Sequence, residues 1–272
     1  MIQISFNQKS IQNNVIISIG ELIKSLKQTA RQKSSDYSTI QSGGVRSCDS
    51  RSRSQSRLTF PQSGICLCIE NSMISPQNTN LLFNMLSKGS NLKTLILHKV
   101  GLQLTASPSH NSSTQETSGI NKTPFVTMLA HPRCKIASLK LSSNNLGLES
   151  CLCISHALVL NQQIRCPLTR LDLAKNNIGA KGMHLLAESL KENRSLKFLN
   201  ISSNNIQDSG ALAVSKLLKA QSKGRPLSAN ECRMSCLREI LMSDNSISSQ
   251  GLVPLIHALT PKQLKNEKFN QR

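Results

Sequence analysis

The residues best suited to hold a metal ion in this sequence are three pairs of closely spaced cysteines. The pairs are Cys66-x-Cys68, Cys151-x-Cys153 and Cys232-x3-Cys236. A zinc site of the finger type needs two residues between paired cysteines and a second matched pair of ligands. No pair has that spacing, so we expect the cysteines to pack in the protein interior. We accordingly expect no metal ion and no other cofactor.

Motifs for catalysis are absent from the sequence. It contains no glycine-rich phosphate loop, no Gly-x-Ser-x-Gly and no His-Glu-x-x-His. His156 and His184 fall in segments with helical spacing, where no carboxylate is placed to orient either ring. The sequence therefore predicts that this protein is not an enzyme.

Basic residues are the other chemically active group, since 33 Lys and Arg face 14 Asp and Glu in a chain of 272 residues. The resulting net charge of +19 is spread along the chain, and only 3% of the residues are aromatic. A specific nucleic-acid platform needs concentrated positive charge and rings that stack on bases. Nucleic-acid recognition is therefore disfavoured, and an acidic protein surface is the better match to this charge.

The elements that must position these residues repeat along the chain. The template Leu-x-x-Leu-x-Leu-x-x-Asn-x-Leu is filled from Leu168 to Ile178 and, 28 residues later, from Leu196 to Ile206. Four further copies begin at residues 64, 92, 136 and 237, and the first two of these lack the Asn. Repeats of this length indicate a stacked architecture.

Each copy predicts a short strand, a turn and an amphipathic helix. The Leu-x-Leu pair alternates with period two, so both side chains point inward from a strand. Asn176 and Asn204 stand where the chain leaves the strand, and we expect both to be buried and bonded to backbone groups. Met183, Leu186 and Leu190 then follow with helical spacing. Because one unit cannot bury its own apolar face, the units must stack.

This pattern resembles the leucine-rich repeat family, specifically its ribonuclease-inhibitor-like subclass with 28-residue repeats. The segments LTRLDLAKNNIGAKGMHLLAESLKENRS and LKFLNISSNNIQDSGALAVSKLLKAQ carry the resemblance, which covers about Gly64–Leu259. The resemblance implies an α/β solenoid, a right-handed curved horseshoe arc with parallel strands on its concave face and helices on its convex face. The expected strands of the single parallel sheet contain Leu67, Leu95, Leu139, Leu171, Leu199 and Ile240.

The chain divides into four parts on this interpretation. They are an N-terminal cap or degenerate repeat at 1–33, a Ser/Arg-rich disordered linker at 34–63, the repeat domain at 64–259 with insertions near 104–122 and 221–232, and a basic tail at 260–272. No apolar run is long enough for a membrane span, and the start lacks a signal-peptide pattern. Nine cysteines without a secretory signal indicate a reducing compartment. We therefore expect a cytoplasmic protein, with a cilium, the cytoskeleton or the nucleus also open.

The resemblance implies that the concave face binds another protein. Its exposed positions are mostly basic, with one aromatic side chain among them. The candidate partner-binding residues are Lys93, Lys99, Lys140, Arg170, Lys175, Lys197, Phe198 and Arg238. Phe198 either anchors a partner or packs on its neighbours.

The sequence therefore predicts a non-enzymatic intracellular scaffold with an acidic protein partner, and leaves its oligomeric state open. Two alternatives remain, a GTPase-activating regulator of the Ran-activator type and a structural component of a cilium or centrosome. The Ran activators of similar repeat type usually end in an acidic tail, whereas residues 262–272 hold four basic residues and one acidic residue.

Overall fold

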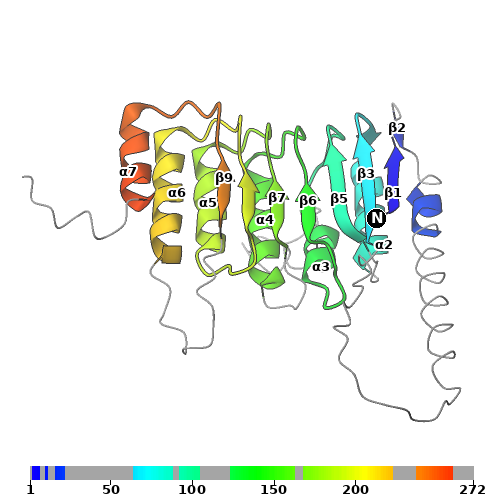
Figure 1. Cartoon of the computed structure of the whole chain (residues 1–272). Helices are drawn as coiled ribbons and strands as arrows, with labels where there is room; N and C mark the ends of the chain where they lie inside the picture. The colour runs from blue at the N-terminus through cyan, green and yellow to red at the C-terminus, as the bar shows by residue number, and fades with distance from the viewer. Residues whose placement is uncertain are drawn as a thin grey trace, which may run out of the picture.

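The computed structural model describes residues 2–6, 10–11, 16–21, 64–87, 92–104, 123–162, 168–222 and 237–259. The predicted linker 34–63, the basic tail 260–272 and nearly all of the two predicted insertions lie outside the described residues. Within the described part, short strands lie side by side in one row, with helices along one side of that row (Figure 1).

A parallel sheet of seven strands runs through the array. In spatial order its strands are β1 (Ile2–Phe6), β3 (Ile65–Glu70), β5 (Leu92–His98), β6 (Ser138–Lys140), β7 (Arg170–Asp172), β8 (Phe198–Asn200) and β9 (Glu239–Leu241). The register places equivalent residues side by side, since Leu139 pairs with Leu171 and Leu171 with Leu199. The parallel solenoid predicted from the repeats is therefore confirmed.

The strand β1, at the N-terminal edge of the sheet, was not predicted by the sequence pattern. A second small parallel sheet joins β2 (Ser10–Ile11) to β4 (Met73–Ile74) and continues this extra repeat. Equivalent positions pair in both sheets: Ile4 with Leu67, Phe6 with Ile69, and Ile11 with Ile74. The template missed this copy because Lys9 stands at the place of the turn Asn.

Helices cover one face of the sheet, in the order in which they occur along the chain. They are α2 (Pro76–Ser87), α3 (Pro124–Ala130), α4 (Gly147–Asn161), α5 (Gly179–Leu190), α6 (Gln207–Ser222) and α7 (Ser249–Leu259). Residues 16–21 are also helical. Each helix from α4 to α6 packs against the next one. In α5 the predicted apolar stripe of Met183, Leu186 and Leu190 is fully buried.

The turn asparagines form a ladder of hydrogen bonds through the stack. The Nδ2 of Asn176 donates to the carbonyl oxygens of Leu141 and Leu173, both at 2.9 Å. Its Oδ1 accepts a hydrogen bond from the backbone N–H of Asn144 at 2.8 Å. Asn176 and Asn204 are both fully buried. The prediction that they would be buried and bonded to the backbone is therefore confirmed.

In the repeats that contain β3 and β5 to β9, a residue with positive φ follows the strand and turns the chain toward the helical layer. The residues at this repeat position are Asn71, Lys99, Ser143, Lys175, Ser203 and Asp244, with φ between 51° and 60°. Residues other than glycine seldom adopt a positive φ. The turn therefore adopts this conformation despite the intrinsic preference of its residues for a negative φ. As a consequence, two of the candidate lysines, Lys99 and Lys175, lie in turns rather than on strands.

Candidate functional site

The side chains that point away from the helices form the open face of the sheet. Because the strands are parallel and in register, residues at one repeat position line up in a row across the strands. The first row is Gln3, Cys66, Thr94, Ser138, Arg170, Phe198 and Glu239. The second row is Ser5, Cys68, Ile96, Lys140, Asp172, Asn200 and Leu241.

At the centre of the open face, Arg170 stacks on Phe198. The guanidinium carbon of Arg170 lies 3.9 Å from the centroid of the Phe198 ring, within the range of a cation–π contact. Arg170 is exposed and Phe198 is half-buried. A stacked guanidinium still presents its N–H donors at its edge, where they can meet a carboxylate. The ring thus packs on a neighbour and, in doing so, orients a charged donor group.

Lys140 adds a second exposed positive charge on the adjacent strand, where it is paired in register with Asp172. The Oδ1 of Asp172 accepts a hydrogen bond from the backbone N–H of Ala174 at 3.1 Å. In the next repeat Asn200 makes the same bond to Ser202, also at 3.1 Å. Asp172 therefore stabilises the turn that follows β7, and no ion pair joins it to Lys140.

Three further candidates lie toward the beginnings of the strands. The backbone carbonyl of Lys197 accepts a hydrogen bond from the N–H of Arg238 at 2.8 Å, which places the two residues side by side before β8 and β9. Lys93, near the beginning of β5, lies against Gly64. Lys197 and Arg238 are exposed, whereas Lys93 is half-buried.

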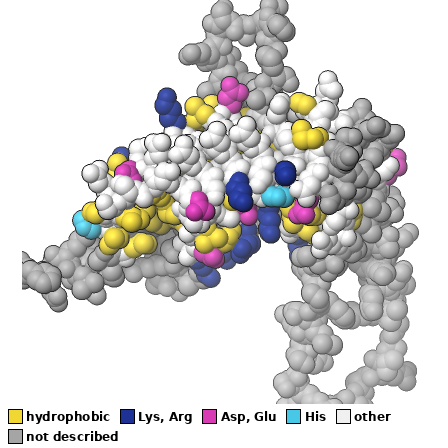
Figure 2. All heavy atoms as spheres, turned by 90° about the horizontal axis from the view of Figure 1, so that it is seen from above, with side chains coloured by type: hydrophobic (Ala, Val, Ile, Leu, Met, Phe, Trp, Pro, Cys, Tyr) yellow, Lys and Arg dark blue, Asp and Glu magenta, His cyan; other side chains and the backbone are white. Residues whose placement is uncertain are grey.

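The remaining two candidates, Lys99 and Lys175, are exposed in the turns that follow β5 and β7. The structure thus places Lys140, Arg170 and Phe198 on the three neighbouring strands β6, β7 and β8, with Arg170 and Phe198 at the first residue of their strands and Lys140 at the last residue of its own. It places Lys175 and Lys197 at opposite ends of the strands. Viewed from above these turns, Lys and Arg side chains gather near the middle of the molecule (Figure 2).

The N-terminal part of the open face carries thiols in place of charges. Cys66 and Cys68 are each 5% exposed and are free cysteines. Burial raises the pKa of the Cys66 thiol, and the positive charge of Lys140 partly opposes that rise. Burial, together with the Glu70 carboxylate, raises the pKa of Cys68 to about 11. Both thiols are therefore uncharged at neutral pH and add no charge to this part of the face.

Metal-binding residues do not gather in the described part of the chain. Among the residues described, no group of three or more His, Cys, Asp or Glu could hold a metal ion.

A contact that the sequence analysis missed joins His98 Nδ1 to Ser142 Oγ at 2.9 Å. The two residues are 44 positions apart, yet both occupy the same repeat position, so aligning the repeats could have predicted their proximity.

The C-terminal part of the open face is acidic and apolar. Glu239 and Asp244 are both exposed, and Ser203 Oγ donates a hydrogen bond to Asp244 Oδ2 at 3.4 Å. Leu241, in the strand between these acids, is 41% exposed. The positive charge of the open face is therefore concentrated on its middle strands.

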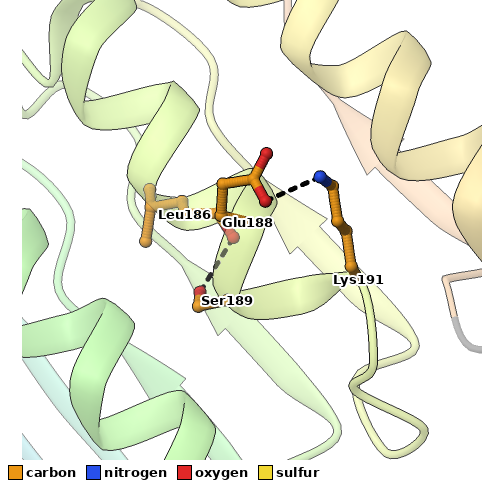
Figure 3. A network of polar contacts seen from close by, with 4 residues as sticks. All are labelled: Leu186, Glu188, Ser189 and Lys191. Carbon is orange, nitrogen blue, oxygen red and sulfur yellow. Dashed lines mark hydrogen bonds and ion pairs between the residues drawn. The ribbon is translucent and has the colours of Figure 1, made fainter.

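Acidic side chains of the helical layer are engaged locally. At the end of α5, Glu188 Oε2 lies 2.6 Å from Lys191 Nζ, and Ser189 Oγ donates to the carbonyl of Leu186 at 2.8 Å (Figure 3). No ion pair joins a described acidic side chain to Lys140, Arg170, Lys175 or Lys197. These four positive charges therefore remain available to an approaching partner.

Comparison with known proteins agrees with this geometry. A family model described as Leucine Rich repeat matches residues 166–187 and 192–215, the segments that contain β7 with most of α5 and β8 with part of α6. The match supports a leucine-rich repeat family, and the fold is an α/β leucine-rich repeat solenoid. Repeats of this kind commonly mediate binding between proteins. No match was found among curated proteins.

No helix within the described ranges is both long enough and apolar enough to cross a membrane.

Proposed function

We propose that this protein is a non-enzymatic scaffold that binds an acidic partner protein on the open, concave face of its repeat arc. The observation that carries the proposal is the stacking of Arg170 on Phe198 at 3.9 Å, beside the exposed Lys140. Strands β6 and β7 are neighbours in the sheet, and neighbouring strands lie about 4.8 Å apart. Lys140 and Arg170 are therefore close enough to engage one acidic segment together.

The chemistry of this centre favours a carboxylate-bearing segment. Arg170 offers a planar array of donors that matches a carboxylate, and Lys140 offers a flexible point charge. Phe198 holds the guanidinium in place, which lowers the entropy lost when a partner binds. Positive charge on the surface also speeds association with a negative partner, an effect that salt weakens.

The other candidates extend this surface along the strands. Lys99 and Lys175 lie beyond the carboxyl ends of the strands, while Lys93, Lys197 and Arg238 lie toward their beginnings. An acidic partner that spans the strand length would reach both groups, whereas a short acidic segment would contact only the centre.

Affinity purification with mass spectrometry identifies the partner, and binding of that partner to Arg170→Glu then tests the site. We expect the variant to lose at least about tenfold in affinity, because charge reversal replaces attraction by repulsion at the centre of the interface. The matched control is Lys181→Glu, which changes an exposed charge on α5 instead. Equal binding by wild type and a folded Arg170→Glu variant would place the partner elsewhere.

We also propose the ribonuclease-inhibitor-like subclass and an intracellular, cytoplasmic location. The 28-residue step from Leu171 to Leu199, with a full helix between the two strands, supports the subclass. The free cysteines of the described part, such as Cys66 beside Cys68, support a reducing compartment. Imaging of the tagged chain in its native cells tests the location.

A further inference from the structure

The last helix, α7, exposes apolar side chains at repeat positions that are buried in the helices before it. Leu252 is 47% exposed, whereas Cys151, Met183 and Ala211 at the same position are fully buried. The helices that carry these three residues each pack against the next helix of the stack, where Gly182 of α5 lies against Cys151 and Gly210 of α6 lies against Met183. Leu252 therefore lies on the side of α7 that, in the earlier helices, packs against the next repeat.

Two more positions of α7 repeat this contrast. Ile256 is 59% exposed, but its counterpart Ala187 in α5 is 1% exposed. Leu259 is 70% exposed, and its counterpart Leu190 is fully buried. Hydrophobic side chains gather at the end of the molecule where α7 lies (Figures 1 and 2). An apolar face of this kind on a soluble domain marks an interaction surface.

The edge strand β9 presents hydrogen-bond donors on the same side. In the repeats before it, one N–H just after each strand donates to the carbonyl of the next strand: Leu141 to Asp172, Leu173 to Asn200, and Ile201 to Leu241. The equivalent group after β9 is the N–H of Met242. No residue in the described part of the chain accepts a hydrogen bond from it. The exposed side of α7 and the outer edge of β9 together form what we call the open end. The open end resembles the interface between two neighbouring repeats in both its apolar and its polar parts.

We propose that this open end binds the same end of a second copy of the chain and forms a two-fold symmetric dimer. In that arrangement the exposed apolar side chains of α7 pack against their counterparts, and the two β9 strands pair edge to edge in antiparallel fashion. The proposed partner-binding centre lies on the three strands next to β9, namely β8, β7 and β6, and its open face stays accessible.

Charge complementarity favours this pairing of like ends. In an antiparallel pairing of the two β9 strands, the beginning of one strand lies beside the end of the other. Arg238 directly precedes β9 and Asp244 stands in the turn after it, so the pairing brings the Arg238 side of one copy toward the Asp244 side of the other, and symmetry repeats this approach. Both side chains are exposed, and opposite charges that approach in this way favour the pairing, whereas like charges would oppose it.

A head-to-tail stack through β1 fits less well. Inside the array, the N–H of Asn204 donates to the side-chain Oδ1 of Asn245, as each turn Asn does to the next. In the sequence of the first repeat, Lys9 aligns with the turn Asn, and a lysine side chain offers no acceptor for such a bond. The N–H of Asn245 would therefore lack its partner in a head-to-tail stack.

Sedimentation velocity on the full chain, over a concentration series into the micromolar range, tests the dimer. We expect wild type to show a reversible monomer–dimer equilibrium. Ile256→Asp should raise the dimer dissociation constant at least about tenfold, since it buries a charge in an apolar contact. Leu259→Asp provides a second variant at a still more exposed position. The matched control, Leu148→Asp, alters an exposed leucine of α4 and should leave the dimer unchanged.

Circular dichroism establishes that each variant is folded. A monomeric wild type at every concentration would overturn the proposal. So would a dimer that survives both Ile256→Asp and Leu259→Asp. If the full chain is monomeric and removal of residues 260–272 creates the dimer, those residues are the occupant of the face and the second copy is not. Arg170→Glu should bind its partner weakly and still dimerise, so a failure of the dimer and a failure of the proposed function can be told apart.

Discussion

The backbone N–H of Asn176 donates a hydrogen bond of 2.9 Å to the side-chain Oδ1 of Asn204, one repeat further along the chain. The side chain of Asn204 also donates from its Nδ2 to the carbonyl of Leu173 at 2.9 Å. A single amide thus satisfies a donor and an acceptor of the preceding repeat. Because both asparagines are fully buried, water cannot take over these roles.

Replacing Asn204 by Ala should therefore lower the free energy of unfolding by about 1–3 kcal/mol, since buried backbone groups lose their partner. Asn176→Ala should cost a similar amount. Urea denaturation of each variant measures the change. Ser209→Ala, at an exposed position of α6, serves as the control and should be nearly neutral. Unfolding curves for both Asn variants that overlay the wild-type curve would contradict a stabilising ladder.

The sequence predicted the repeats whose positions carry the usual residue types. Leu171, Leu199 and their equivalents define six strands, and the turn Asn predicted where the chain leaves each later strand. The first repeat was predicted only as an N-terminal cap or degenerate repeat, without its strand, because Ile4 and Phe6 replace the leucines and Lys9 replaces the Asn. A signal was present, since buried Ile16 and Ile19 stand at the helical offsets of a normal repeat.

The candidate site could be predicted only in outline. Position in the template predicted that Arg170 and Phe198 would lie on the open face, because the strand period fixes the side of each residue. The stacking of one side chain on the other depends on their rotamers and on packing across two strands, which the template does not determine. The engagement of Asp172 in its own turn also depends on local hydrogen bonding.

The contribution of each lysine to partner binding should depend on its position along the strand. Lys140 lies within β6, paired in register with β7, whereas Lys197 lies before β8 and outside the strand. We expect Lys140→Glu to reduce the association rate with the acidic partner by about tenfold at low salt, and Lys197→Glu to reduce it less. Surface plasmon resonance at two salt concentrations measures both rates. Equal losses for the two variants would mean that the partner spans the full strand length.

Alkaline pH should destabilise the fold through Cys151. Burial raises the pKa of this thiol from 9.0 to about 12. Above pH 9 the unfolded chain loses this proton while the folded chain keeps it, so stability is lost as the pH rises toward 12. Within that window the contribution of one such group is about 1.4 kcal/mol per pH unit.

Denaturation of wild type and Cys151→Ala, in reducing buffer at about pH 8 and about pH 10, isolates this effect. The variant is less stable at both pH values, because the substitution leaves a cavity in the core. Its stability should nevertheless fall less steeply between them, since other alkaline titrations are common to both proteins. Parallel declines would show that the thiol of Cys151 is not the titrating group.

Acid pH should act on the junction between α6 and α7 through Asp208. Its Oδ1 accepts a hydrogen bond from the backbone N–H of Ser248 at 2.7 Å, and its Oδ2 accepts one from the hydroxyl of the same residue at 2.6 Å. The bond from the Ser248 hydroxyl, followed by that from its backbone, holds the pKa of Asp208 below its ordinary value of 3.8. The folded chain thus releases this proton more readily than the unfolded chain.

The stabilisation by Asp208 is therefore complete above pH 3.8 and is lost as the pH falls through the lower folded-state pKa. Asp208→Asn should weaken protection of the α7 amides against hydrogen exchange at neutral pH. At a pH below the lowered folded-state pKa of Asp208, its exchange rates should approach those of wild type, since both side chains are then uncharged. The matched control is Glu149→Gln, which alters an exposed carboxylate on α4, away from this junction. A difference between wild type and Asp208→Asn that is equally large at both pH values would assign the effect to shape rather than to charge.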